Sequence, residues 1–359
     1  MLYFLSQHLT QYWGPFRLFQ SHALLLAGGA FTAALLVWLF LPRLWHSLPR
    51  DRGKAICRDL GGMASAGKPT GAGFLVTLFA LPVILLFVPL AFWDALTLVA
   101  VYAAMLFGYL DDKAAVPWGE LKKGLLDAVC AVAIAWFIAK GHSTLIWLPF
   151  VKGMWLVPMW LYVPCAAFLL WFTMNATNCS DGVDSLAGAL TIIALLLLSV
   201  LLYVVIGYRP IAHYFLLPCN PEAARWAILL MTVAGAFGGY LWYNAEPSKV
   251  LMGDAGSRFL GILVGAASLV TGNPFLVLAF APIVLVNGGG GLGKLVLLRL
   301  AKKFGYDIDE KSVIRRIRFP LHDHCKKNLG WTNAQVLMRF TLLQLAIMPI
   351  LLLLLVKIR

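Results

Sequence analysis

The chain has 359 residues, of which 61% are hydrophobic and only 13% are charged, and its mean hydropathy is +0.83. A soluble domain is usually about half apolar and about a quarter charged, so this composition excludes an ordinary soluble protein. The net charge of +13 fits either anionic lipid headgroups or a phosphorylated substrate, whereas no nucleic-acid recognition module fits between the apolar runs.

Ten apolar segments each approach the roughly 20 residues with which a helix crosses a bilayer. In chain order they are 23–42, 72–93, 95–110, 125–140, 156–174, 186–207, 224–243, 257–272, 275–298 and 336–356. Strands of alternating polarity, which a membrane barrel requires, are absent from the sequence. We therefore predict an all-α integral membrane protein, embedded in a lipid bilayer as one polytopic domain over residues 1–359, with a large cytoplasmic loop at 299–335.

The positive charges are divided unevenly between the two sides of this predicted membrane domain. Lysine and arginine gather in the loops after the first, third, seventh and ninth segments, and the opposite loops hold few of them. Cytoplasmic loops carry such an excess, so we predict that these loops face the cytoplasm. Because the number of segments is even, both termini are then predicted to be extracytoplasmic.

Acids, amides and histidines gather on that same predicted side. Asp111 and Asp112 end the third segment, and the polar stretches 174–188, 244–261 and 319–331 occupy other loops there. A lone acid at the end of a span is more often a solvated interfacial residue than a catalyst. Two adjacent acids are less ordinary, because like charges repel each other unless a cation lies nearby.

Asp254 is the strongest single candidate for a functional residue. It precedes the glycine-rich helix start AGSRFLG near membrane depth, where an unpaired charge is costly. The other polar residues have simpler interpretations. Asp181 and Asp184 could be ordinary acids at a helix start, and a histidine such as His322 is more often a loop residue than a ligand.

Together these residues predict a site for Mg²⁺ and phosphate in a cleft on the cytoplasmic face. Carboxylate oxygens suit Mg²⁺, which usually binds one or two protein carboxylates and completes its shell with water and substrate phosphate. The turn GDAGS would present main-chain N–H groups to an anion at a helix start. Lys122 and Lys123 would offset the charge of a diphosphate.

Five motifs also carry a resemblance to a known family. They are KPTGAG (68–73), GYLDD (108–112), NATNCSDGVDSLAG (175–188), WYNAEPSKVLMGDAGSRFLG (242–261) and PLHDHCKKNLGW (320–331). In this order they resemble the polyprenyl-phosphate N-acetylhexosamine-1-phosphate transferases over nearly the whole chain, and within them the muramoyl branch. The resemblance implies a bacterial plasma-membrane enzyme of peptidoglycan synthesis, by analogy a homodimer. Such an enzyme transfers phospho-N-acetylmuramoyl-pentapeptide from UDP-N-acetylmuramoyl-pentapeptide to undecaprenyl phosphate, with Mg²⁺ as cofactor.

The resemblance also assigns roles to residues of this chain. It implies that Asp254 coordinates Mg²⁺ and that Asp111 and Asp112 are an essential pair, of which Asp111 is the candidate to deprotonate the lipid phosphate. The residues expected to bind substrate are Lys68, Lys122, Lys123, Asn175, Asn178, Asp181, Gly182, Val183, Asp184, Asn244, Ser257, His322, Asp323 and His324.

Three positions depart from the family pattern. Asp323 stands in place of the middle one of three histidines, and Ser65 and Ala115 stand where the family has lysines. Lys68 and Lys113 lie close to these two positions in the sequence and are candidate substitutes. The glycine-rich stretch NGGGGLG, inside the ninth segment, is expected to break that helix and to shape the entry of the lipid tail.

Two other functions stay open at this point. One is a sister enzyme that transfers N-acetylglucosamine phosphate to the same lipid. The other is a secondary transporter, whose acids and broken helices would mark ion sites near the middle of the membrane. The sequence also leaves open whether the lipid phosphate attacks directly or a phospho-enzyme forms on an aspartate, and which of Asp111 and Asp112 carries the proton.

Overall fold

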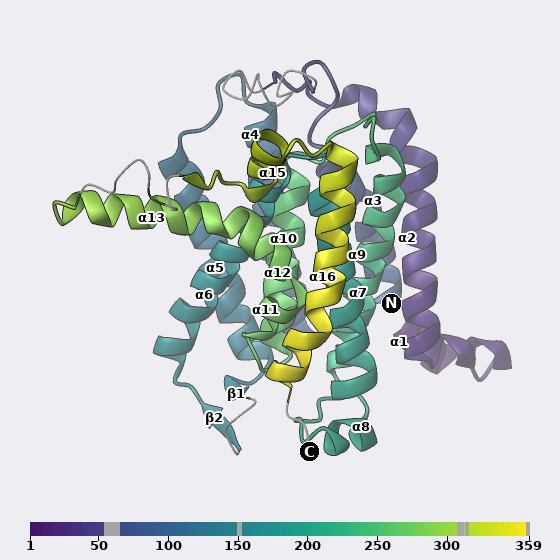
Figure 1. Cartoon of the computed structure of the whole chain (residues 1–359). Helices are drawn as coiled ribbons and strands as arrows, with labels where there is room; N and C mark the ends of the chain where they lie inside the picture. The colour runs from purple at the N-terminus through teal and green to yellow at the C-terminus, as the bar shows by residue number, and fades with distance from the viewer. Residues whose placement is uncertain (54–64, 149–152, 307–311, 313–315, 357–359) are drawn as a thin grey trace.

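A computed structural model describes the chain except for residues 54–64, 149–152, 307–311, 313–315 and 357–359. The described part is a bundle of helices with one short β-hairpin (Figure 1). Eight residues of the predicted 299–335 loop, at 307–311 and 313–315, thus lie outside the described residues.

The elements in chain order are α1 (Leu2–Leu9), η1 (Gly14–Gln20), α2 (His22–Leu44), η2 (Trp45–Ser47), α3 (Ala72–Phe87), α4 (Phe92–Lys113), α5 (Glu120–Gly141), β1 (Leu145–Trp147), β2 (Met154–Leu156), α6 (Met159–Ser180), α7 (Leu186–Val200), η4 (Leu201–Ile206), α8 (Arg209–Tyr214), α9 (Ala223–Asn244), α10 (Gly253–Val270), α11 (Leu276–Phe280), α12 (Pro282–Val284), η5 (Leu285–Gly289), α13 (Gly290–Lys303), α15 (Leu321–Leu329) and α16 (Asn333–Leu355).

The prediction of an all-α integral membrane protein is confirmed. Within the described part of the chain, eight helices are long and apolar enough to cross a membrane. They account for eight of the ten predicted segments. The other two form the shorter helices α3, with 16 residues, and α10, with 18. The count of ten spans, and the side of the membrane on which each end lies, stay predictions.

The predicted segment 72–93 is divided between two helices. Helix α3 ends at Phe87, and Val88 is extended because it precedes Pro89. The chain then turns within four residues into α4, which begins at Phe92.

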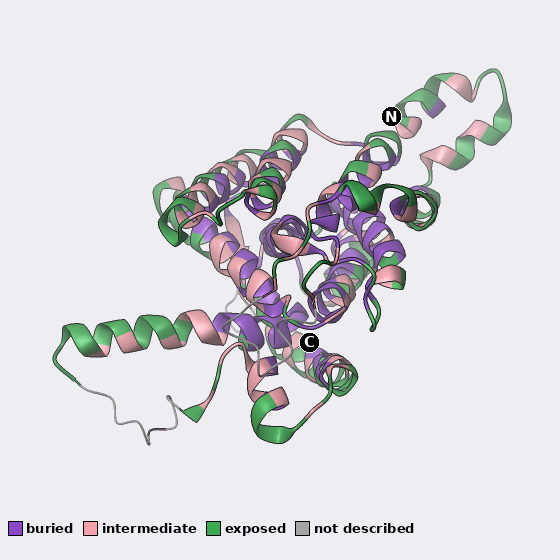
Figure 2. Ribbon diagram, turned by 90° about the horizontal axis from the view of Figure 1, so that it is seen from above, coloured by how far each residue is buried: buried purple, intermediate pink, exposed green. Residues whose placement is uncertain are grey.

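Helix α10 forms the centre of the bundle. Every residue from Ala255 to Val270 is buried, and the helix packs against α3, α4, α6 and α7. Figure 2 shows buried residues concentrated in these inner helices. Small residues allow the close approach: a side chain on Gly73 of α3 would collide with the main chain of Gly256. The packing therefore fixes the start of α10, including Asp254, against α3 and α4.

The ninth predicted segment, 275–298, breaks at a different place from the one expected. The interruption falls at Ala281, before Pro282, whereas the glycines lie in the π-helical turn η5 and the first turn of α13, within a helix that continues to Lys303. Gly288 packs directly on the carbonyl of Ala176, where no side chain would fit. Helix α13 then projects from the bundle with no buried residue (Figures 1 and 2).

The two ends of the bundle differ in what they carry. Helix α15 and the end of α4 lie at the top of Figure 1, whereas the β-hairpin, α8 and the C-terminus lie at the bottom, and the N-terminus lies in the lower half. The polar motifs thus gather at the end of the bundle away from the termini.

Candidate active site

Loops from distant parts of the chain meet around the first turn of α10. Main-chain hydrogen bonds of 2.8 to 3.0 Å connect the 68–73 motif to residues 248–253. The ammonium group of Lys68 donates to the hydroxyl of Ser248 at 3.0 Å. Lys68 thus joins the two loops at the site.

Asp112 holds the start of α10 from the end of α4. Its Oδ1 accepts the N–H of Asp254 at 3.2 Å, and its Oδ2 accepts the N–H of Ala255 at 3.3 Å. These are N–H groups that a helix leaves unpaired at its N-terminus. The anion bound by the GDAGS turn is therefore Asp112 rather than a substrate phosphate, which corrects the expectation from the sequence.

Two glycines make this contact between helices feasible. A methyl group on Gly108 of α4 would lie 2.7 Å from the carbonyl oxygen of Asp254. Gly253 has a φ of +71°, a conformation that side chains disfavour, and a side chain there would strike the carboxylate of Asp112. The sequence GYLDD therefore needs its glycine to bring the two aspartates beside α10.

Lys123 joins two of the predicted catalytic acids. Its Nζ forms an ion pair with Oδ2 of Asp111 and lies 3.9 Å from Oδ2 of Asp254. The other oxygen of Asp111 accepts the N–H of Trp118 at 2.8 Å. Lys122 is directed elsewhere: its Nζ lies over the ring of Trp118, 3.6 Å from the ring centre. Of the two lysines expected to offset a diphosphate, Lys123 is the one in contact with the acids.

The structure adds two residues that are missing from the sequence-based site. Asp127 of α5 and Arg258 of α10 form a buried ion pair, with 1% and 3% of each residue exposed. Arg258 also donates to Oδ2 of Asp254 at 3.1 Å. A signal for them existed in the sequence, because each is a charged residue within an apolar helical segment.

The motif at the end of α6 attaches to this cluster. Asn175 donates to the carbonyl of Trp171 at 2.9 Å and lies near the carboxylate of Asp127. The side-chain oxygen of Asn178 accepts the hydroxyl of Ser257 at 3.1 Å. Asn175, Asn178 and Ser257, all expected to bind substrate, thus contact other protein groups that surround Asp254.

The loop between α6 and α7 is tied to the loop before α10. Asn244 is buried; its oxygen accepts the N–H of Ser185, and its amide donates to the carbonyl of Val250, both at 2.8 Å. Oδ2 of Asp184 accepts the N–H of Ser248 at 3.2 Å. Asn244 and Asp184 therefore position main chain in this structure.

His322 is the histidine that reaches this loop. It is 2% exposed. Oδ1 of Asn287 accepts the main-chain N–H of His322 at 2.8 Å and lies 3.1 Å from the ring nitrogen Nδ1. A side chain on Gly182 would strike its ring. The neighbouring Asp323 places Oδ1 3.5 Å from Nε2 of His322. His324 instead accepts a main-chain N–H six residues earlier.

The remaining residues of the α6–α7 turn differ in exposure. Asp181 follows the last residue of α6 and is half-buried, Gly182 is exposed, and Val183 is buried. Gly182, beside His322, is therefore the residue of this turn most open to a ligand.

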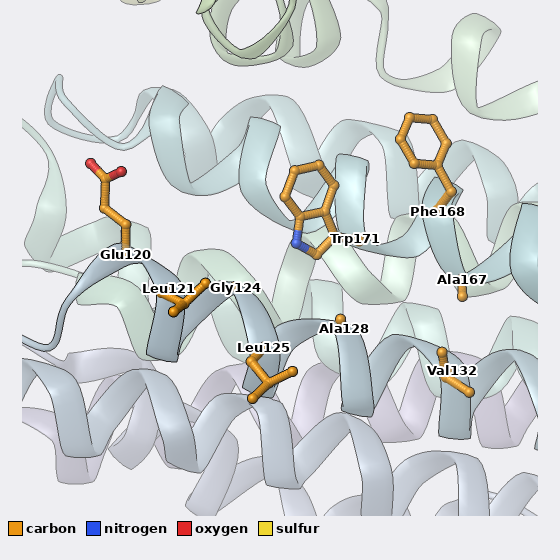
Figure 3. Close-up of a pocket in the computed structure, with 9 residues that line it drawn as sticks. All are labelled: Glu120, Leu121, Gly124, Leu125, Ala128, Val132, Ala167, Phe168 and Trp171. Atoms are coloured by element: carbon orange, nitrogen blue, oxygen red, sulfur yellow. The ribbon is translucent and has the colours of Figure 1, made fainter. Parts of the chain in front are cut away.

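An apolar groove lies beside the cluster, between α5 and α6 (Figure 3). Its volume is about 490 Å³. It is lined by Glu120, Leu121, Gly124, Leu125, Ala128, Val132, Ala167, Phe168 and Trp171. Glu120 and Leu121 stand at the start of α5, beside Lys123, so the groove begins close to the acidic cluster. Gly289 packs on the ring of Phe172, which is stacked with Phe168.

The cluster carries an excess of negative charge. Its carboxylates are Asp111, Asp112, Asp127 and Asp254, and the cations in contact with them are Lys123 and Arg258. Counted with every carboxylate ionised, four negative charges against two positive ones leave two, the charge that a divalent cation would neutralise. Among the described residues, no three histidine, cysteine or acidic side chains converge as metal ligands. Carboxylate oxygens are ligands that Mg²⁺ prefers, and Asp254 and Asp111 offer them here.

Comparison with known proteins agrees with this geometry. The glycosyl transferase family 4 pattern matches residues 95–272, which hold the acidic cluster. The matched family and the helical membrane fold indicate the class: a polytopic phosphosugar transferase.

Similarity extends beyond the matched range. The phospho-N-acetylmuramoyl-pentapeptide-transferase of Treponema pallidum (strain Nichols) is 44% identical over 343 residues, which cover 94% of this chain and 91% of that one. The protein of the same name from Gemmatimonas aurantiaca is 32% identical over 372 residues, with 95% of each chain covered. The chain therefore belongs to the phospho-N-acetylmuramoyl-pentapeptide-transferase family.

Proposed function

We propose that this chain transfers phospho-N-acetylmuramoyl-pentapeptide from UDP-N-acetylmuramoyl-pentapeptide to undecaprenyl phosphate and releases UMP. One observation carries the proposal: residues from four of the motifs contact one another around the first turn of α10, and His322 of the fifth lies against Gly182 of the third. The names of the relatives support the muramoyl donor over the N-acetylglucosamine donor. The clustering of acids at one end of the bundle argues against a transporter site near its middle.

We assign Mg²⁺ to Asp254. Its side chain is 25% exposed, compared with 6% for Asp111 and 2% for Asp127, so it is more open to a metal and substrate than either of these carboxylates. Bound there, Mg²⁺ would supply Lewis-acid polarisation of the diphosphate.

Asp111 is the better candidate of the adjacent pair for taking the proton of the lipid phosphate. Asp112 accepts two main-chain N–H groups from the start of α10. Oδ1 of Asp111 accepts one main-chain N–H, that of Trp118. The partner of its Oδ2 is the flexible side chain of Lys123, 26% exposed, which can exchange the carboxylate for a substrate phosphate. That exchange would free Asp111 and neutralise charge on the phosphate in one movement.

The lipid phosphate would then attack the sugar-bearing phosphorus directly. A new P–O bond forms, the bond to the UMP oxygen breaks, and UMP leaves with the negative charge. Phosphoryl transfer asks the protein chiefly for positioning and charge neutralisation. Two main-chain N–H groups engage Asp112 and weaken it as a nucleophile. Asp111 would carry the proton taken from the lipid phosphate and would therefore be a poor nucleophile, which favours direct attack over a phospho-enzyme.

The groove between α5 and α6 is the proposed path of the polyprenyl tail. Eight of its nine lining residues are apolar (Figure 3). It begins at Glu120 and Leu121, in the same turn of α5 as Lys123, so a lipid phosphate held at Lys123 could place its chain in the groove. The excess of lysine and arginine in the loops supports a cytoplasmic orientation of this end, where UDP-sugars are found, within a bacterial plasma membrane. A homodimer stays a prediction by analogy.

The test is UMP release by the purified protein in detergent, with undecaprenyl phosphate, Mg²⁺ and either UDP-N-acetylmuramoyl-pentapeptide or UDP-N-acetylglucosamine. We expect turnover with the muramoyl donor alone and its loss in Asp254→Asn. Asp94→Asn is the matched control, because Asp94 lies at the opposite end of α4. Turnover with UDP-N-acetylglucosamine alone would move the chain to the sister activity, and full activity of Asp254→Asn would exclude Asp254 as the metal ligand.

A further inference from the structure

Arg258 connects a buried carboxylate to a partly exposed one. Its Nη1 donates to Oδ1 of Asp127, and its Nη2 donates to Oδ2 of Asp254 at 3.1 Å. The planar guanidinium suits such a bridge, because its donors point in fixed directions, whereas a lysine ammonium is a single point of charge.

The stability of the fold does not explain this pair. Two charges must lose their water to be buried, and well-packed apolar residues of similar volume often serve stability as well or better. Nε of Arg258 is buried and has no hydrogen-bond partner among the described residues, which is a further cost. A buried group retained at such a cost suggests a role in the adjacent site.

The contacts of Asp254 indicate that role. Its Oδ2 faces Arg258 and Lys123, while no hydrogen bond or ion pair of its Oδ1 is found among the described residues. We propose that Arg258, held by Asp127, is a positioning residue that fixes the Asp254 carboxylate through one oxygen and leaves the other directed to the metal. The inference rests on the proposed function, in which Asp254 is the ligand of Mg²⁺.

The experiment compares the protein with a double variant, Asp127→Leu/Arg258→Leu, by calorimetric titration with Mg²⁺ in the absence of substrates. One negative and one positive charge leave together, so the net charge of the cluster is unchanged and Mg²⁺ affinity reports on the orientation of Asp254. Removal of a group that orients a metal ligand typically weakens metal binding about 10- to 100-fold. We expect a loss of at least about tenfold in Mg²⁺ affinity with thermal unfolding within a few degrees of the parent.

Two further variants complete the design. Arg258→Lys keeps a cation beside Asp127 but cannot bridge both carboxylates, so we expect weakened Mg²⁺ binding even if the double variant fails to fold. Glu222→Gln/Arg225→Gln removes an exposed ion pair at the far end of α9 and should bind Mg²⁺ like the parent.

The outcomes separate this inference from the proposed function. Parent-like Mg²⁺ affinity in the folded double variant, or in Arg258→Lys, would overturn the positioning role and leave the assignment of the metal to Asp254 intact. A parent that binds no Mg²⁺, or an Asp254→Asn variant that binds it as the parent does, would overturn the metal assignment and the inference together. In Asp127→Leu/Arg258→Leu or Arg258→Lys, a lower kcat with an unchanged KM for the UDP-sugar would support the positioning role.

Discussion

The crossing of α4 and α10 at Gly108 offers a sharp test of how the site is assembled. In Gly108→Ala, the new methyl group would lie 2.7 Å from the carbonyl oxygen of Asp254, whereas ordinary contacts begin at 3.4 Å. The helices would therefore have to part by about 0.7 Å, the difference between these two distances. Asp111 and Asp112 move with α4, and Asp254 moves with α10.

The expected effects on stability and on activity differ in size. Overpacking of this kind lowers the free energy of unfolding by about 1–3 kcal/mol. The replacement of glycine by alanine within a helix raises it by about 1 kcal/mol. The net loss of stability should thus be about 2 kcal/mol or less. Catalysis is more sensitive, because a misplacement of about 1 Å can lower the rate about 100-fold. We expect turnover to fall at least about tenfold in a variant that still folds.

The measurement combines UMP release with thermal unfolding in the same detergent. Gly238→Ala is the matched control: it also places a methyl group in the middle of a membrane helix, and nothing lies within 4 Å of that group. It should keep parent-like turnover and be slightly more stable. Parent-like turnover in Gly108→Ala would show that the acids do not depend on this close approach, and the assembly argued above would be wrong.

Two other predictions concern the groove and the histidine. In Ala128→Trp, the indole should fill the groove and displace about 60 Å² of lipid contact, which corresponds to a loss of about 1.5 kcal/mol of binding free energy. KM for undecaprenyl phosphate should therefore rise about tenfold. An unchanged KM would show that the tail lies elsewhere. In Gly182→Ala, the methyl group should push the ring of His322 away from the turn. Turnover should fall about tenfold or more with unfolding unchanged, and a fully active variant would remove His322 from the site.

The positions of the membrane helices were largely predictable, because a bilayer sets both the length and the polarity of what crosses it. The segments 186–207 and 224–243 differ by one residue at each end or less from the helical spans Leu186–Ile206 and Ala223–Asn244. The errors came from local backbone chemistry. Pro89 divided the predicted segment 72–93, and the glycines from Gly288 to Gly291 served close packing rather than a break.

The gathering of the motifs was predictable for a different reason. Each acidic or amide motif followed an odd-numbered segment, so the alternation of spans brought them to one end of the bundle. The pairing of side chains within that end was not predictable, because it depends on how helices rotate and approach. The expected anion site at GDAGS is an example: its N–H groups are taken by Asp112, 142 residues away in the chain.

Asp127 and Arg258 show that one physical rule identifies site residues that the motifs alone did not indicate. A charge inside an apolar helix needs a partner of opposite sign at the same depth, and Asp127 lies within such a helix, between Leu126 and Ala128. Arg258 stands four residues after Asp254, on the same face of α10 as that carboxylate. A cation on that face can serve both acids only if α5 and α10 lie side by side at the site, which is the arrangement found. The need to pair a buried charge thus links the packing of two helices to the orientation of the proposed metal ligand.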